Sequence, residues 1–196
     1  MNVLQKIIDF KPTGIQAEKG KLLLSEPLIA DAIFKRSVLF LAEHDEFDGS
    51  FGLIINKQTE HKICEIADEF KDCNLPVFIG GPVQTDQLFF LHSIGFISES
   101  YEVIDGVYWG GNLNEIKLMI HTGEINESNF RFFLGYSGWS KAQLDNELKH
   151  ESWLVLNSTK RDVFTEKPEK LWGDLLQSFG NKYNNWLNIP INPQHN

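Results

Sequence analysis

The segment GYSGWSKAQLDNEL, residues 135–148, has the outline of the nucleophile turn of a serine hydrolase. In that turn a strand leads through G-x-S-x-G into a helix, and both glycines are needed because the backbone passes close to neighbouring elements. Here Trp139 stands two residues after Ser137, and the glycine lies one position earlier, at Gly138. The sequence therefore favours a structural turn, with Gly138 supplying a backbone angle that other residues avoid, over a nucleophilic Ser137.

Several histidines are available as a base for such a serine, but the spacing singles out none of them. His92 follows the apolar run LFFL, at the end of a predicted strand. A hydrolase that uses Ser137 or His92 is therefore an alternative function that the sequence keeps open.

Two glycine pairs, at 80–81 and 110–111, each end an apolar run. A glycine pair before a helix N-terminus can hold an anion through free N–H groups and the helix dipole. Neither pair belongs to a G-x-G-x-x-G or P-loop pattern, and Pro82 removes one donor after the first pair. Tight turns are therefore the favoured interpretation, and nucleotide or anion binding is a further alternative.

Potential metal ligands gather in one predicted loop, which contains Glu43, His44, Asp45, Glu46 and Asp48. Their spacing is not that of a calcium loop, and polar hairpin tips have this composition without any metal. The two cysteines, Cys64 and Cys73, form neither a C-x-x-C pair nor a Cys/His zinc pattern. We therefore expect a solvated loop, idle thiols, and neither a metal nor another cofactor.

Polar residues follow the ends of several predicted strands or lie on a predicted helix, and small-ligand sites combine such groups with apolar walls. The candidate crevice for a ligand or partner comprises Asn56, Lys57, Gly80, Gly81, Gln84, His92, Gly138, Trp139, Gln143, Glu147 and Trp153. The simpler interpretation is that Asn56, His92 and Gln143 satisfy backbone groups at strand and helix ends, and the sequence favours it.

The periodicity of apolar residues defines the elements that must position these side chains. It predicts strands at 21–24, 37–42, 51–56, 77–81, 88–93, 131–136 and 152–156, with hairpin turns at Asp48-Gly49 and Asp105-Gly106. Helices are predicted over 63–70, from Asn112 to a cap at Gly123, from Ser140, and from Pro168. Strands outnumber helices, and hairpins stand beside helix-linked strands, so a mixed-sheet α+β domain fits best.

Length and charge limit the function classes. The 196 residues, 42% of them hydrophobic, predict one domain over 1–180 and an irregular tail over 181–196. The formal net charge is -9 and cations never cluster densely, so direct nucleic-acid binding is not expected. No apolar stretch at the N-terminus suits a signal peptide or a membrane span, so the expected location is the cytoplasm, without membrane attachment.

Five segments in order resemble the AlgH/YqgE family of bacterial proteins: SEPLIADAIFKRSVLFLAEHDEFDGSFGLIINK, FIGGPV, LFFLHS, GYSGWSKAQLDNEL and SWLV. The match extends from Lys21 to Trp172, and the order of the segments is more specific than any one of them. The resemblance implies a single cytoplasmic domain with a mixed, mostly antiparallel sheet curled into a partial barrel and flanked by helices. It also implies no established biochemical activity, and a regulatory role in transcription without a known mechanism.

The residues and the resemblance together favour a non-enzymatic regulatory or adaptor protein. It would bind an unidentified protein partner or a small ligand in the candidate crevice. Any effect on transcription would be indirect, because the acidic chain repels DNA. A hydrolase-type enzyme and a nucleotide- or anion-binding protein are the alternatives.

Overall fold

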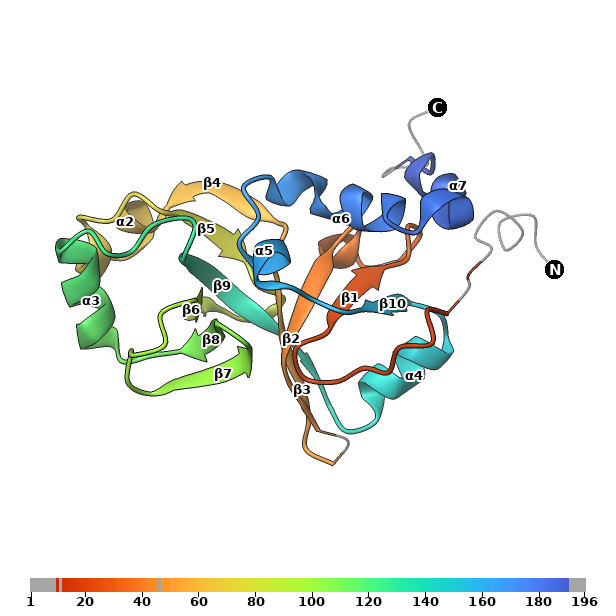
Figure 1. Cartoon of the computed structure of the whole chain (residues 1–196), viewed down its shortest axis with the longest axis horizontal. Helices are drawn as coiled ribbons and strands as arrows, with labels where there is room; N and C mark the ends of the chain where they lie inside the picture. The colour runs from red at the N-terminus through yellow and green to blue at the C-terminus, as the bar shows by residue number, and fades with distance from the viewer. Residues whose placement is uncertain (1–9, 11, 46, 191–196) are drawn as a thin grey trace.

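Strand β9, Phe130–Trp139, lies at the centre of a ten-stranded sheet and joins its two halves (Figure 1). The computed structural model describes residues 10, 12–45 and 47–190. The strands follow the order β10-β1-β2-β3-β9-β6-β8-β7, and β5 pairs with β9 and with β4. The pairs are antiparallel except β5 with β9, in whose parallel register Val77 stands opposite Phe132. The sheet is therefore mixed, mostly antiparallel and not closed.

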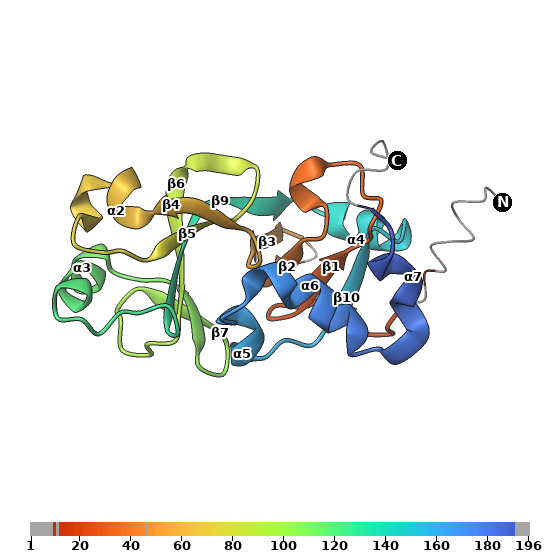
Figure 2. The same cartoon turned by 90° about the horizontal axis from the view of Figure 1, so that it is seen from above.

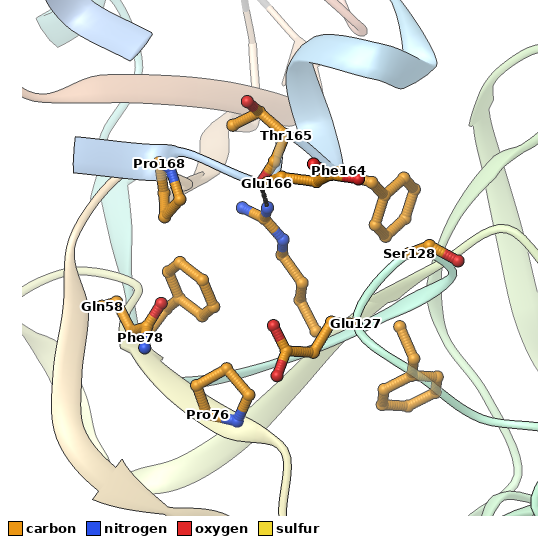
Figure 3. Close-up of a pocket in the computed structure, with 11 residues that line it drawn as sticks. Gln58, Pro76, Phe78, Glu127, Ser128, Phe164, Thr165, Glu166 and Pro168 are labelled. Atoms are coloured by element: carbon orange, nitrogen blue, oxygen red, sulfur yellow. Dashed lines mark hydrogen bonds between the residues drawn. The ribbon is translucent and has the colours of Figure 1, made fainter. Parts of the chain in front are cut away.

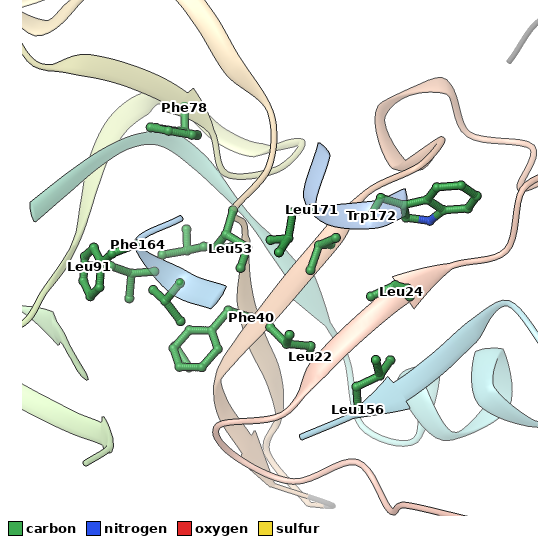
Figure 4. Packing of buried hydrophobic residues seen from close by; sticks show 14 of the residues in the cluster. Leu22, Leu24, Phe40, Leu53, Phe78, Leu91, Leu156, Phe164, Leu171 and Trp172 are labelled. Atoms are coloured by element: carbon green, nitrogen blue, oxygen red, sulfur yellow. The ribbon is translucent and has the colours of Figure 1, made fainter. Parts of the chain in front are cut away.

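The first half of the sheet is buried on both faces. It consists of β10 (Trp153–Leu156), β1 (Leu22–Ser25), β2 (Val38–Asp45) and β3 (Gly49–Ile54). Leu22 and Phe40 belong to the apolar cluster under helix α6 (Pro168–Gln177) (Figure 4). Leu23 and Leu39 belong to the opposite cluster, under helix α4 (Gln143–Lys149). Burial on both faces explains the continuous apolar runs, and the hairpin predicted at Asp48-Gly49 is confirmed.

The second half of the sheet carries the other predicted hairpin. Its strands are β4 (Gln58–Lys62), β5 (Pro76–Ile79), β6 (Val83–His92), β7 (Ser100–Ile104) and β8 (Val107–Gly110). The Asp105-Gly106 turn joins β7 to β8, and Gly106 has the positive φ of 67° that such a turn needs. The helix predicted over 63–70 is two short pieces, α2 (Ile63–Ile66) and η2 (Asp68–Phe70), because Ala67 between them is extended.

The helix ends follow local capping rules with one exception. Helix α3 (Leu113–His121) begins after Asn112, whose side chain accepts from the backbone N–H of Asn114, and α6 begins at Pro168, both as predicted. The helix predicted from Ser140 begins at Gln143 instead, because Ala142 adopts a left-handed conformation with φ 59°. The predicted capping contact is still made, since the Ser140 N–H donates to Gln143 Oε1 over 3.1 Å.

The C-terminal segment differs from the irregular tail predicted from residue 181. It forms η3 (Gly180–Tyr183) and α7 (Asn184–Leu187), which follow α5 (Lys160–Val163) and α6 in the chain. The remaining short helical turn, η1 (Ala32–Phe34), precedes β2. Tyr183 and Trp186 are buried in the core, and this burial orders a stretch whose polar composition predicts none. Residues 191–196, the end of the predicted tail, lie outside the described part of the chain.

The helices flank the sheet, as the two views show. Helices α6 and α7 lie on one side of β1 and β10, α4 lies on the other side, and α2 and α3 lie at the far end of the second half (Figures 1 and 2). The expected fold, a single α+β domain with a partly curled, mostly antiparallel sheet, is confirmed. Within residues 10, 12–45 and 47–190, no helix has the length and apolar character needed to cross a bilayer.

The two halves of the sheet meet where the β5–β6 connection crosses β9 in direct backbone contact. The Gly80 N–H donates to the Leu134 carbonyl over 2.8 Å, and the Gly80 carbonyl accepts from the Ile54 N–H over 2.9 Å. A Cβ atom on Gly80 would lie 2.1 Å from the Gly135 carbonyl oxygen. Glycine is therefore required at position 80 because no side chain fits between the two backbones.

We predict that Gly80→Ala lowers the free energy of unfolding by more than about 3 kcal/mol, because one of the two backbones must move. Gly173→Ala is the matched control: its Cβ would meet only Leu187 Cδ2 at 3.8 Å, within a helix. There alanine is expected to add about 0.5–1 kcal/mol of stability. Urea unfolding followed by circular dichroism measures both, and equal stability of the two variants would contradict the prediction.

Candidate functional site

An open crevice with a volume of about 810 Å³ lies where β3, β6, β8 and β9 meet, beside the β2–β3 hairpin. We call it the aromatic crevice. Its lining comprises Lys19, Glu43, His44, Asp45, Asp48, Gly49, Ser50, Phe51, Val83, Gln84, Phe89, Trp109, Tyr136, Gly138, Trp139 and Ser140. Its volume exceeds those of two other cavities among the described residues, which are about 290 and 450 Å³.

The floor of the aromatic crevice consists of four half-buried rings in mutual contact. The Phe51 ring centroid lies 5.0 Å from that of Trp109 and 5.1 Å from that of Tyr136. Phe89 completes the group, 5.3 Å from Tyr136. The Trp109 Nε1 is buried and has no hydrogen-bond partner among the described residues. Each ring comes from a different strand, so the sheet itself assembles the floor.

Gly138 gives the floor its shape. It lies inside β9, directly opposite Phe51 of β3, and has no positive φ. A Cβ atom at this position would lie 2.9 Å from the Cε2 atom of Tyr136. The predicted role of Gly138 in a turn is therefore wrong, and glycine is needed because the Tyr136 ring lies over it.

The rim of the aromatic crevice is acidic. Glu43 stands opposite Phe51 across the β2–β3 pair, and Asp45 and Asp48 lie at the hairpin end, against a single cation, Lys19, in the described lining. The backbone N–H of Phe47 donates to Asp45 over 2.6 Å, and this bond, together with that from Asp48, lowers the pKa of the Asp45 carboxyl. The rim therefore carries negative charge at neutral pH.

The structure does not bring the eleven predicted crevice residues into one site. Gln84, Gly138 and Trp139 line the aromatic crevice. The other eight, which are divided among separate places, are Asn56, Lys57, Gly80, Gly81, His92, Gln143, Glu147 and Trp153. The rings of Phe51, Phe89, Trp109 and Tyr136, which form the floor, are absent from the predicted set. Their only sequence signal is an aromatic residue within a strand, which equally describes the core residues Phe40 and Phe133.

Four of the predicted residues form one hydrogen-bonded group, of which Trp139 is part of the crevice wall. The Glu147 Oε2 atom accepts from the Trp139 Nε1–H over 2.9 Å and from the Trp153 Nε1–H over 2.8 Å. The Gln143 amide donates to Glu147 Oε1 over 3.1 Å. Trp139 and Trp153 are 6% and 2% exposed. These polar groups satisfy one another, so Glu147 and Gln143 position the wall instead of facing a ligand.

Asn56 and Lys57 hold the segment before β2. Asn56 Oδ1 accepts from the Val38 N–H over 2.7 Å, and its amide donates to the Arg36 carbonyl. The Lys57 ammonium donates to the Ile33 carbonyl over 2.6 Å, and burial lowers its pKa. Both side chains therefore satisfy backbone groups, as the simpler interpretation predicts for Asn56.

Ser137 lies within β9, opposite Gly52, two residues before the strand ends at Trp139. Its side chain is 1% exposed, and its hydroxyl donates to the Gly80 carbonyl over 3.1 Å. Gly81 contacts the same stretch, since a Cβ atom on it would lie 2.2 Å from the Tyr136 carbonyl carbon. Ser137 therefore reinforces the contact between the two backbones, and no nucleophile turn surrounds it.

His92 is fully buried in the second half of the sheet, between the rings of Tyr108 and Phe130. Its Nε2 atom contacts the Ser100 hydroxyl over 3.0 Å, and its Nδ1 atom accepts from the Ile94 N–H over 3.3 Å. Burial lowers the pKa of the imidazole to about 4, so His92 is neutral at physiological pH. The satisfied ring has a structural role, as the simpler interpretation predicts.

The glycine pair at 110–111 precedes α3, but the helix N-terminus is occupied by its own side chains. Asn112 Oδ1 accepts from the N–H groups of Asn114 and Glu115, and the Glu115 carboxylate accepts from Ser98. The protein therefore supplies the negative charge that an anion would bring.

In the part of the chain that the structure describes, no three His, Cys, Asp or Glu side chains are arranged so that they could hold a metal ion. Cys64 and Cys73 are free thiols, and burial raises the pKa of the Cys73 thiol.

We predict that Glu147→Ala lowers the free energy of unfolding by about 2–4 kcal/mol, because two buried indole N–H groups lose their acceptor. Glu147→Gln keeps an acceptor oxygen and should cost less than half as much. Lys149→Ala, an exposed change on the same helix, is the control and should cost less than about 0.5 kcal/mol. If denaturant titrations give the same loss for Glu147→Ala and the control, the shared carboxylate has no structural role.

The neutral buried imidazole predicts acid sensitivity. Because the pKa of His92 is lower in the folded chain, the unfolded chain binds the extra proton between pH 6.5 and about 4. The contribution of neutral His92 to the free energy of unfolding is fully present above pH 6.5. It decreases by up to about 3 kcal/mol as the pH drops to 4. His92→Phe keeps the ring stack and should show a shallower loss over this range in unfolding titrations. Parallel pH profiles for the two proteins would contradict the assignment.

Comparison with known proteins agrees with the resemblance found in the sequence. The AlgH-like family model matches residues 22–184. The chain is 42% identical over 175 residues to a UPF0301 protein of Chlorobium limicola, covering 89% of this chain and 93% of that protein. It is 39% identical over 197 residues to a UPF0301 protein of Bacteroides thetaiotaomicron, covering 100% of both.

Two solved structures have the same fold. The solution structure of AlgH from Pseudomonas aeruginosa matches with a TM-score of 0.69 and 25% identity, over 92% of this chain and 94% of that one. The crystal structure of DIP2367 from Corynebacterium diphtheriae matches with a TM-score of 0.72 and 20% identity, over 88% and 93%. On the family match and the identity to these relatives, the chain belongs to the AlgH-like family.

Proposed function

We propose that the protein is a non-enzymatic regulatory or adaptor protein that binds a basic segment of a protein partner in the aromatic crevice. The observation that carries this proposal is the floor of four contacting, half-buried rings under an acidic rim. A role in transcription would then be indirect, through the partner. A cytoplasmic location stays a prediction from the sequence.

The chemistry of the crevice selects the partner. Aromatic faces attract Arg and Lys side chains by about 0.5–2 kcal/mol each, and the apolar stems of those side chains pack on the rings. Glu43 and Asp48 are exposed and make no described side-chain hydrogen bond, so their charges are available to a cationic partner. The net charge of -9 adds long-range attraction for a basic segment and repulsion for an acidic one.

The alternatives have less support. A hydrolase would need Ser137 or His92 to reach a substrate, whereas both side chains are buried and bonded to other groups. An anion at either glycine pair would have to compete with hydrogen bonds that the protein already makes there. The Gly80 N–H donates to the Leu134 carbonyl, and the Asn114 N–H donates to the Asn112 side chain.

A short peptide of alternating arginine and leucine residues tests the proposal, with the same peptide carrying glutamate for arginine as its control. We expect the basic peptide to shift the backbone amide signals of the crevice lining in NMR spectra, with an affinity that falls as salt rises. The acidic peptide should leave the spectrum unchanged. Binding of both peptides, or shifts confined to another surface, would contradict the proposal.

Charge removal at the rim provides the matched variants. The double variant Glu43→Gln/Asp48→Asn should weaken the basic peptide about tenfold, because two rim charges each contribute roughly 0.5–1 kcal/mol. Glu169→Gln/Asp174→Asn removes the same charge from exposed positions on α6 and should leave the affinity unchanged. An equal loss in both double variants would assign the effect to net charge alone.

A further inference from the structure

A second cavity, of about 290 Å³, lies between β5, the start of β9 and the α5–α6 connection (Figure 3). It shares no lining residue with the aromatic crevice. Its volume is near the lower end of the range for small-molecule sites, about 300–1,000 Å³, so it suits a ligand of about the size of one amino acid.

Arg131 brings a buried positive charge to this cavity. The residue is 4% exposed, and its Nη1–H donates to the Ile55 carbonyl over 2.9 Å. Its Nη2–H donates to the Thr165 carbonyl over 2.5 Å, and the guanidinium lies 4.6 Å from the Phe78 ring centroid. A guanidinium has five N–H donors, of which these bonds use two. No carboxylate in the described residues lies within ion-pair distance of it.

Buried charges in proteins are normally paired, because an isolated ion loses its hydration. Burial lowers the pKa of Arg131 to about 10, which still leaves it cationic at neutral pH. A guanidinium with free donors binds a carboxylate through two parallel hydrogen bonds. Glu127 acts on Arg131 from beyond ion-pair distance, so the free donors of Arg131 remain available to the carboxylate of a ligand.

Opposite charge lies at the same cavity. Glu127 and Glu166 are exposed residues of its lining, and Figure 3 shows the Glu127 carboxylate directed into the cavity. The side chains of Phe78, Phe164, Pro76 and Pro168 provide apolar walls. Two carboxylates beside one guanidinium disfavour a polyanion such as a nucleotide, but they suit a ligand that carries both charges.

We propose that this cavity binds a free α-amino acid with an apolar side chain, its carboxylate on Arg131, its ammonium on Glu127, and its side chain against Phe78 and Phe164. The site is independent of the proposed peptide binding in the aromatic crevice.

L-leucine and L-phenylalanine are the probes, with N-acetyl-leucine and leucine amide as analogues that lack one of the two charges. In calorimetry and thermal unfolding of the full chain, the free amino acids should bind saturably and raise Tm. Each analogue should bind at least about tenfold more weakly, because leucine amide leaves Arg131 without a carboxylate and N-acetyl-leucine leaves Glu127 without an ammonium group. Absence of binding at about 10 mM amino acid, or equal binding of the analogues, would overturn the proposal.

Arg131 also ties two carbonyl groups, so its replacement would disturb the fold, and Glu127→Gln is the diagnostic variant. It should weaken L-leucine about tenfold and leave N-acetyl-leucine unchanged, because only the ammonium contact is lost. Glu124→Gln, in the same loop but outside the lining, should change neither affinity. Unchanged L-leucine binding in Glu127→Gln would overturn the ammonium assignment. Retention of L-leucine binding in Glu43→Gln/Asp48→Asn separates this site from the aromatic crevice.

Discussion

The backbone contact between Gly80-Gly81 and β9 is the constraint on which the rest of the structure depends. At this crossing β9 exchanges β5 for β3 as its neighbour, and Gly135, with φ 66°, lets the strand bend there. The Gly80 carbonyl accepts from Ile54 on one half of the sheet and from Ser137 on β9. Ser137, which resembles a nucleophile in the sequence, thus stabilises this crossing through its hydrogen bond to Gly80. It is buried because Gly80 and Gly81 lie next to it in space.

Both candidate sites depend on this shared strand. The early part of β9 carries Arg131, which reaches the end of β3 and the α5–α6 connection through two carbonyl groups. The late part carries Tyr136 and Gly138, which shape the floor of the aromatic crevice. The sites differ in charge, one with a buried cation and one with an acidic rim, so one chain offers two chemically distinct surfaces.

Local rules predicted the parts of the fold that depend on neighbours in sequence. The two hairpin turns, the Asn112 cap and the Pro168 helix start are of this kind. The prediction of a turn at Gly138 was wrong because pairing with β3 extends β9 through this residue. The segment with Tyr183 and Trp186 was predicted to be irregular because it is ordered only by contact with a core that is distant in sequence. The predicted crevice residues are divided among separate places for the same reason: the direction of a side chain such as Glu147 or Asn56 depends on partners that lie elsewhere in the sequence. The sequence signal of the aromatic floor is not specific, because half-buried rings and fully buried rings both occur within strands.

The pair of indoles on Glu147 has a consequence for binding at the crevice. Trp139 is part of the crevice wall, and Trp153 lies in the interior beside β1, yet one carboxylate oxygen holds both. An occupant that displaced Trp139 would have to break a bond anchored in the interior, so this wall is rigid before anything binds. A preorganised wall loses little conformational entropy when a partner arrives. It also admits only partners whose shape already fits, which makes the crevice selective by geometry as well as by charge.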